Sequence, residues 1–250
     1  MATHEIPCAA SSLLADLVDG AEVGLVEVVR TRVSVHYETG DPHVPVLTVC
    51  SPEAVRLPNS LVTGTLPSPG ATVSLGAGGL RTSGGNWRVR RWWQPPRPVG
   101  LPVPTTATLL AVERDLRLPG VPVPRASYDG LSPSTLVGAG PGLTPAGDDV
   151  LAGALVAAHA TADPRLPLWR ATTRTALATT ETTAVSRALL HHALDGYACP
   201  ELDDFLTALC RDRGISATTT ALLAVGHSSG AALIAGVLHT FRTHHLEGAA

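Results

Sequence analysis

The sequence contains no lysine, because all 18 of its basic residues are arginines. A Walker A phosphate loop, a Schiff-base enzyme and the usual kinase site each need a lysine amine, so these three classes are excluded. Aromatic residues make up only 4% of the chain, and its formal net charge is −3. Without a basic field or an aromatic stacking surface, we expect no binding to nucleic acid or to a membrane surface.

Cysteine is also sparse, and its spacing contains no metal or redox motif. The four cysteines, Cys8, Cys50, Cys199 and Cys210, form no CxxC pair. The start of the chain lacks the basic and apolar segments of a secretory signal, and no apolar run approaches the roughly 18 residues of a membrane-spanning helix. We therefore expect a cytoplasmic protein with reduced thiols.

The residues that are abundant predict a folded α+β protein. The chain has 250 residues, of which 44% are hydrophobic and 16% are charged, which suits one large domain or two small ones. A first helix is expected at residues 11–19, with Ser11 or Ser12 as its cap. Short β-prone segments then recur between glycine and proline clusters, at residues 23–36, 44–50, 60–63, 71–75 and 86–93. This spacing predicts a small antiparallel β barrel or sandwich.

The second half of the chain has a helical pattern instead. Its few charges indicate closely packed helices, at residues 105–117, 148–162, 167–180, 182–195, 201–213, 216–224 and 229–243. A proline-rich stretch at 95–104 predicts a stiff connector between the halves. The expected organisation is a β-rich N-terminal domain at 1–94, which includes the first helix, then the connector, then a mainly α-helical C-terminal domain at 105–250.

The densest motif is GAGPGLTPAGDD at residues 138–149, in which four glycines and two prolines impose an irregular loop. A helix is expected to begin near Asp148, and the free N–H groups and dipole at such a start favour an anion. However, Asp148 and Asp149 would themselves cap the helix and occupy its positive end. The motif therefore suits a plain capped helix, an anion held through a cation, or an Asp pair that binds an amine, an amide N–H or Mg²⁺.

A second loop, GHSSG at residues 226–230, repeats this pattern, because glycine and hydroxyl side chains again precede a helix of small residues. One of its two serines is the expected cap. Gly153 and Gly236 lie at comparable points of the two helices and would let them approach closely. If the helices pack side by side and parallel, both loops end at one site, and His227 lies near the Asp pair.

Three polar residues between the two loops share one expected helix face. Thr183, Ser186 and Arg187 follow the i, i+3, i+4 spacing. Hydroxyls inside a helix commonly bond to their own backbone, whereas Arg187 could hold a carboxylate or phosphate with two N–H groups. In the β-rich part, Asn59 follows a proline, and it could contact a polar ligand or serve only as a turn residue.

Four strings together resemble one protein family: LPNS at 57–60, GPGLTPAGDDVLAG at 140–153, TTAVSRALLHHALDG at 182–196 and GHSSGAALIAG at 226–236. Over about residues 20–240 the chain resembles the AllH-like family, the third subunit of oxamate carbamoyltransferase from anaerobic allantoin breakdown. The second loop of this family usually carries Thr-Ser where this chain has two serines. The resemblance implies participation in the transfer of a carbamoyl group between oxamate and phosphate, together with other carbamoyltransferase subunits.

This chemistry fits the residues already described. Carbamoyl transfer passes through a tetrahedral oxyanion, which N–H groups of Gly140, Gly142, Gly226 and Gly230 could stabilise. The catalytic candidates are Asp148 and Asp149, which could accept hydrogen bonds from the carbamoyl NH₂, and His227, which could exchange a proton with the leaving nitrogen. The candidate substrate-binding residues are Asn59, Gly140, Gly142, Thr144, Gly147, Thr183, Ser186, Arg187, Ser228, Ser229 and Gly230. Arg187 would hold a carboxylate, and the only cofactor considered is Mg²⁺ at Asp148 and Asp149.

Three interpretations of the function remain open at this point. The chain is an enzyme or enzyme subunit of carbamoyl transfer that acts on carbamoyl phosphate and oxamate-like small molecules. Alternatively, it is a non-catalytic subunit that completes the active site of a partner chain. In the third interpretation, it binds or hydrolyses a small amide or ureide.

Overall fold

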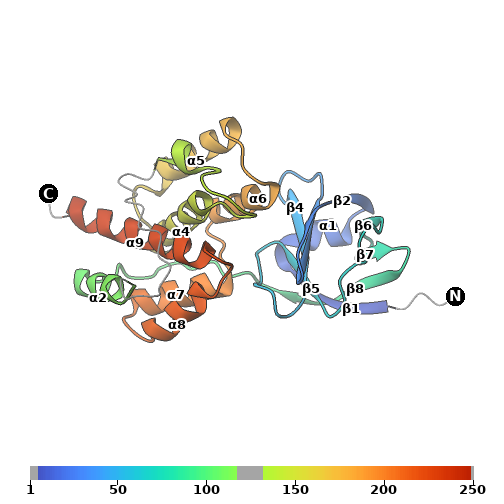
Figure 1. Ribbon diagram of the computed structural model, residues 1–250, viewed down its shortest axis with the longest axis horizontal. Helices are drawn as coiled ribbons and strands as arrows, with labels where there is room; N and C mark the ends of the chain where they lie inside the picture. The colour runs from blue at the N-terminus through green and yellow to red at the C-terminus, as the bar shows by residue number, and fades with distance from the viewer. Residues whose placement is uncertain (1–4, 117–131, 249–250) are drawn as a thin grey trace. The chain divides into compact units, whose positions relative to one another are not determined.

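The computed structural model describes residues 5–116 and 132–248. The chain divides into two compact units, Met1–Pro95 and Pro96–Ala250. The first unit is built around a β barrel and the second is helical (Figure 1), so the expected α+β class is confirmed. The expected domain limits themselves stay a prediction. None of the helices in the described part of the chain combines the length and the apolar character that crossing a membrane demands.

The first unit is a closed barrel of eight strands in the order β1-β5-β4-β3-β2-β6-β7-β8. The strands are β1 (Glu5–Ser11), β2 (Val23–Arg30), β3 (Ser34–Glu38), β4 (Val46–Cys50), β5 (Ser60–Thr63), β6 (Val73–Gly76), β7 (Gly79–Thr82) and β8 (Gly85–Trp93). The expectation of an antiparallel barrel is wrong, because β1 runs parallel to β8 and β4 runs parallel to β5. Residues 51–59 return the chain, so Ser60 at the start of β5 pairs with Thr48 in the middle of β4, and the two strands run parallel instead of forming a hairpin.

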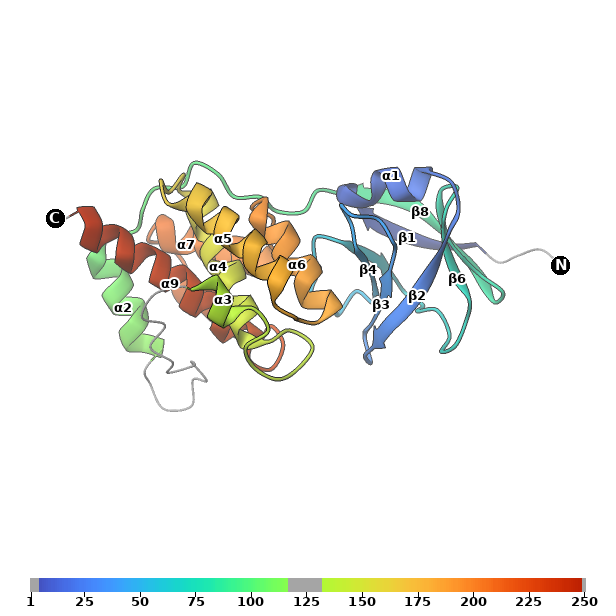
Figure 2. The same cartoon turned by 90° about the horizontal axis from the view of Figure 1, so that it is seen from above.

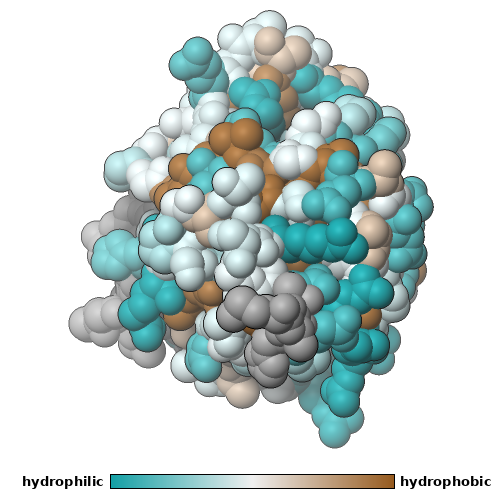
Figure 3. Space-filling view, turned by 90° about the vertical axis from the view of Figure 1, so that its right-hand side faces the viewer, coloured by the Kyte–Doolittle hydropathy of each residue, from teal (hydrophilic) through white to brown (hydrophobic). Residues whose placement is uncertain are grey.

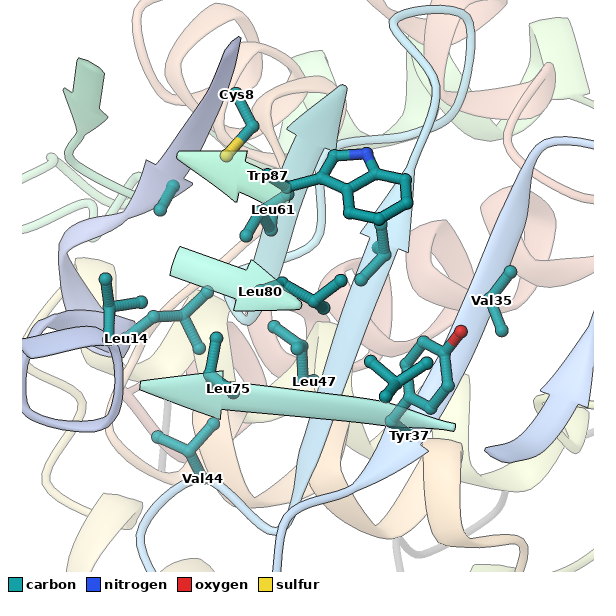
Figure 4. Close-up of a cluster of buried hydrophobic side chains, with 14 residues drawn as sticks. Cys8, Leu14, Val35, Tyr37, Val44, Leu47, Leu61, Leu75, Leu80 and Trp87 are labelled. Carbon is teal, nitrogen blue, oxygen red and sulfur yellow. The ribbon is translucent and has the colours of Figure 1, made fainter. Parts of the chain in front are cut away.

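Alternate residues of these strands fill the interior of the barrel. In β3, Val35 and Tyr37 are buried in the core, and Leu47 and Val49 of β4 join them. This is the period-2 pattern of a strand with one face on a core. Figure 4 shows the cluster, in which the labelled side chains are Cys8, Leu14, Val35, Tyr37, Val44, Leu47, Leu61, Leu75, Leu80 and Trp87.

In the barrel unit, two strands and one helix differ from the sequence-based expectation. Strands β1 and β7 were not expected, because the inward residues of β1 (Ile6, Cys8 and Ala10) are mostly small and β7 lies inside a glycine-rich stretch. The helix expected at 11–19 is divided into a 3-10 turn, η1 (Ser12–Leu14), and a short helix, α1 (Ala15–Asp19). Ser11 is confirmed as the cap, since its hydroxyl accepts a hydrogen bond from Leu13 N at 3.2 Å.

The second unit consists of helices arranged around one central helix. They are α2 (Thr106–Leu116), α3 (Pro133–Leu136), α4 (Ala146–Ala160), α5 (Leu166–Thr179), α6 (Ala184–Leu194), α7 (Pro200–Cys210), α8 (Ile215–Leu223) and α9 (Ser229–Gly248). Helix α4 packs against α9, α6, α3 and α5 (Figure 2). Position 117, the last residue of the helix expected at 105–117, lies outside the described residues. Helix α3 was not expected, since it is a single turn.

The proline-rich segment lies along the helical unit instead of spanning open space. Pro96 O accepts a hydrogen bond from Ala198 N at 2.9 Å, and Leu101 N donates to Ala160 O at the same distance. His159 Nδ1 donates to Pro98 O at 3.1 Å. Proline cannot donate a hydrogen bond but its carbonyl still accepts, so an extended proline-rich chain can be bound in this way.

Among the described residues, few large apolar side chains are exposed. Val26 and Val28 of β2 and Trp92 of β8 are exposed on the barrel unit. On the face that Figure 3 presents, hydrophobic residues lie in separate patches among hydrophilic ones. Scattered apolar residues of this kind are normal for a folded protein and indicate no particular partner.

Candidate functional site

The first glycine loop connects α3 to α4, and its backbone conformation requires glycine. Gly138, Gly140 and Gly142 have φ angles of +72°, +116° and +103°, which lie in the left-handed region. At Gly138 a Cβ atom would lie 2.2 Å from Glu181 O, so a side chain there would push away the segment that precedes α6. The loop is therefore shaped both by its own turns and by its contact with a distant part of the chain.

Asp148 fastens this loop to α6. Its side chain is 1% exposed. Its Oδ1 accepts a hydrogen bond from Gly138 N at 2.9 Å, and its Oδ2 accepts from Ser186 Oγ at 2.7 Å and from the Thr182 hydroxyl. Three donors from the chain thus occupy this carboxylate, which gives it a structural role between α4, the loop and α6.

Asp148 and Asp149 do not cap α4, contrary to the expectation from the sequence. The helix begins two residues earlier, at Ala146, and Pro145 occupies the N-cap position. Both carboxylates therefore lie within the first turn, where negative charge is stabilised by the helix dipole but the side chains are free to point elsewhere. With the helix start two residues earlier, the two neighbouring acids have different surroundings.

Helices α4 and α9 cross at very close range. A Cβ atom on Gly153 would lie 2.2 Å from Leu233 O, and a Cβ atom on Gly236 would lie 2.0 Å from Val150 O. Both glycines are therefore required by the approach of the two backbones, as the sequence predicted. Beyond the end of α4, Arg165 reaches Thr240 O of α9 at 2.9 Å, so the later parts of both segments also lie together.

The two glycine loops meet where α4 and α9 begin. Thr144 Oγ1 of the first loop lies 2.9 Å from Ser229 Oγ, at the first residue of α9. The hydroxyls of both residues also lie close enough to the Asp149 carboxyl to lower its pKa. The two loops therefore meet, as expected from the close packing of the two helices, and the ligand site expected there stays a prediction.

Asp149 is the buried acid of this contact. It is 6% exposed, and its Oδ2 has no hydrogen-bond partner in the described part of the chain. Burial raises the pKa of the Asp149 carboxyl from its ordinary value of 3.8 to about 7. The Ser229 and Thr144 hydroxyls oppose this rise in pKa, and the Asp148 carboxylate adds to it. A carboxyl group with these properties can exchange a proton near neutral pH.

The polar residues expected on one face of α6 divide between separate contacts. Thr183 caps α6 by accepting from Ser186 N at 3.0 Å, and it donates to Leu143 O of the first loop at 2.6 Å. Arg187 donates to the carbonyl oxygens of Leu177 and Thr180 at the end of α5. These contacts hold the loop and α5, and the predicted binding of a substrate carboxylate by Arg187 stays a prediction.

Two of the candidate substrate-binding glycines, Gly147 and Gly230, have N–H groups that already bond within the chain. Gly147 N donates to Ala139 O at 2.9 Å, and Gly230 N donates to Val225 O at 3.0 Å. Gly140 and Gly142 are exposed in the first loop. An N–H group can stabilise an oxyanion only if it points at that oxygen. The N–H groups of Gly147 and Gly230 therefore stabilise the loops themselves.

His227 and Ser228 are exposed on the loop that precedes α9. Ser228 accepts a hydrogen bond from Ala232 N at 3.0 Å through its backbone oxygen. His227 lies two residues before Ser229, which contacts Asp149, so its backbone is near the contact of the loops. Proton exchange by the His227 side chain stays a prediction.

Asn59 belongs to the barrel unit and is buried there. Its Nδ2 donates to Val46 O at 2.7 Å, and its Oδ1 has no partner among the described residues. The bond to Val46 fixes residues 51–59 against β4. A ligand contact for Asn59 stays a prediction.

Thr182 is a site residue that the sequence analysis missed. It is one of three donors to Asp148, but it lies outside α6, whose spacing singled out Thr183, Ser186 and Arg187. Its only sequence signal is its place beside Thr183. In residues 5–116 and 132–248, no group of three or more His, Cys, Asp or Glu side chains is arranged to hold a metal ion. Mg²⁺ at the Asp pair stays a proposal, and it would have to displace the donors that occupy Asp148.

Comparison with known proteins gives one family match. The model of the family described as oxamate carbamoyltransferase subunit AllH matches residues 136–241. No solved structure is significantly similar to the chain. The matched residues include the first loop from Gly138 onward, all of α4 and α6, and the start of α9, where Thr144, Asp149 and Ser229 meet. The resemblance to the AllH family is therefore confirmed over residues 136–241, within the helical unit.

Proposed function

We propose that this chain is a subunit of a carbamoyl-transfer enzyme and that small carbamoyl substrates bind where its two glycine loops meet. The observation that carries the proposal is the position of Asp149 within the family match, buried between Thr144 and Ser229. A buried acid whose pKa lies near 7 is typical of a site that handles protons.

Each step of carbamoyl transfer would require a particular group of the two loops. In the direction that forms carbamoyl phosphate, a phosphate oxygen attacks the carbamoyl carbon of the substrate. A C–O bond forms, the C–N bond to oxamate breaks, and the leaving nitrogen takes a proton. Asp149 would orient the carbamoyl NH₂, His227 would supply the proton, and N–H groups of the loops would stabilise the oxyanion between the two steps.

The test is a transfer assay with carbamoyl phosphate and oxamate on the purified full chain. Formation of phosphate together with N-carbamoylated oxamate by the chain alone would support a self-sufficient enzyme. Activity that appears only after other carbamoyltransferase subunits are added would support a non-catalytic subunit, which is the second candidate. Failure of transfer under both conditions would reject the proposal.

The second candidate is favoured by a specific observation. Asp148, Thr183 and Arg187 are bonded to other parts of the same chain, so fewer groups remain for the substrate than the sequence suggested. A partner subunit would then supply the missing cationic groups for phosphate. Thermal stabilisation by a ureide, without stabilisation by phosphate or carbamoyl phosphate, would instead support a protein that binds or hydrolyses small amides.

A further inference from the structure

The two neighbouring acids of α4 have opposite hydrogen-bonding states. Asp148 accepts three hydrogen bonds, from Gly138 N and the hydroxyls of Thr182 and Ser186. Asp149 is more than nine-tenths buried, yet its Oδ2 has no partner in the described residues. A buried acceptor that is left unpaired costs folding free energy, so its retention points to a partner that binds there.

The surroundings of Asp149 are unsuited to an anion. Among the described residues, the groups that act on its ionisation are the Ser229 and Thr144 hydroxyls and the Asp148 carboxylate, and no arginine or histidine of this part of the chain is among them. The helix start would attract an anion, but the two acids in the first turn already bring negative charge to it. A carboxylate or phosphate placed at Oδ2 would face that charge without a cation between them.

The hydroxyls of Thr144 and Ser229 and the Asp149 carboxyl can both donate and accept hydrogen bonds. A hydroxyl rotates to do either, and a carboxyl whose pKa is about 7 is present in both its protonated and its ionised form near neutral pH. A primary amide matches this set, because its N–H groups satisfy an ionised Asp149 and its carbonyl oxygen accepts from a protonated one. An ammonium group suits only the ionised form, and a carboxylate suits only the protonated form.

We infer that Asp149 Oδ2 hydrogen-bonds the uncharged primary amide of the ligand, and that Asp148 is a positioning residue that does not touch the ligand. The inference rests on the proposed function for the identity of the substrates. The inference also gives the orientation of the substrates. Their carbamoyl or carboxamide end lies between Thr144 and Ser229, and their carboxylate or phosphate end points away from the Asp pair. Asp148 holds Gly138 and α6 in the positions that leave Asp149 between the loops.

The test uses a matched series of small ligands on the full chain. Oxamate and oxalate are nearly isosteric and differ by one amide in place of a carboxylate, and N,N-dimethyloxamate keeps the amide carbonyl but loses both N–H donors. Isothermal titration calorimetry at pH 7 should show that oxamate binds at least about tenfold more tightly than either analogue, since each analogue leaves buried groups unpaired. Equal affinities for the three compounds, or binding of none of them, would overturn the inference.

Two variants separate the roles of the acids. In Asp149→Asn, the new amide can donate to oxalate, so the preference for oxamate over oxalate should fall to within about threefold. In Asp148→Asn, the melting temperature should fall while the preference is kept. Thr144→Val serves as a second site variant, and it should weaken oxamate binding without a change in the partners of Asp148. If Asp148→Asn loses the preference for oxamate and Asp149→Asn keeps it, the ligand binds at Asp148, and the inference is overturned.

The inference and the proposed function fail in different ways. If the selectivity depends on Asp149 but no carbamoyl transfer occurs with or without partner subunits, the proposed function is wrong and the amide site stands. If transfer occurs and Asp149→Asn keeps the full preference for oxamate, the proposed function stands and the amide site is wrong.

Discussion

Thr144 and Ser229 join two glycine loops that lie 85 residues apart in the chain, with their hydroxyl oxygens 2.9 Å from each other. Both hydroxyls also lie close enough to Asp149, on the first turn of α4, to lower the pKa of its carboxyl. The contact depends on α4 and α9 crossing at Gly153 and Gly236, because only two closely packed helices bring both starts together. The candidate site is therefore a product of helix packing.

Substitution of Asp149 by asparagine should stabilise the protein at alkaline pH. The pKa of this carboxyl is raised from 3.8 to about 7 in the folded protein, so folding opposes its ionisation. Between these two pH values the unfolded chain binds fewer protons than the folded one, and the stability of the wild-type protein falls as pH rises through that range. Asparagine is neutral throughout.

Thermal melts of Asp149→Asn and the wild-type protein at about pH 4, 6 and 8 check this prediction, because these conditions cover the interval between the two pKa values. The gain in melting temperature should be largest at pH 8 and small at pH 4. In the same variant, ligand binding or carbamoyl transfer should be strongly reduced. A loss of the cooperative melt would show that the carboxylate is needed for folding, contrary to the structure.

Substitution of Asp148 by alanine should destabilise the helical unit. The change leaves Gly138 N and two hydroxyls without their charged acceptor, and hydrogen bonds to charged groups contribute more than neutral ones. We expect a loss of about 2–4 kcal/mol in the free energy of unfolding, measured by denaturant titration. A change below about 0.5 kcal/mol, the range of ordinary surface substitutions, would show that this network is unimportant.

Alanine at Gly153 or Gly236 should separate α4 from α9. The added methyl group would lie 2.2 Å from Leu233 O or 2.0 Å from Val150 O, which is far closer than atoms pack. We expect a loss of about 1–3 kcal/mol in unfolding free energy and weaker oxamate binding, because the two loops would move apart. Gly24→Ala is the control, since nothing lies within 4 Å of the methyl group it adds. Unchanged binding in both helix variants would contradict the dependence of the site on the crossing.

Alanine at His227 should lower the rate of transfer more than the affinity for substrate. The residue is exposed on the loop before α9, so its removal should leave the melting temperature nearly unchanged. General acid–base catalysis by a positioned side chain contributes about 10²–10⁴-fold to a rate, so kcat should fall within that range while KM changes little. His43→Ala, at an exposed position of the barrel unit, is the matched control. A kcat equal to that of the wild-type chain would remove His227 from proton transfer.

Local pattern was enough to predict the types of most elements. The alternation in β3 and the small residues after each glycine loop depend on neighbours a few positions away, so they are visible in the sequence. Strand β1 was missed because its strand character comes from pairing with distant β8, and β7 was missed because its glycine-rich sequence hides a short hairpin with the adjacent β8. The parallel pairs of the barrel likewise depend on where the chain returns, which local pattern does not encode.

The sequence by itself determined that two glycine loops each open a helix of small residues, and that Gly153 and Gly236 permit those helices to approach. Only the tertiary structure decided what the Asp pair does. Asp148 and Asp149 are the same residue type at adjacent positions, so no sequence pattern distinguishes them. Their partners come from Gly138, Ser186 and Ser229, which are brought there by folding. Burial and hydrogen bonding depend on these distant groups, which provide three donors to Asp148 and, among the described residues, leave Oδ2 of Asp149 without a partner.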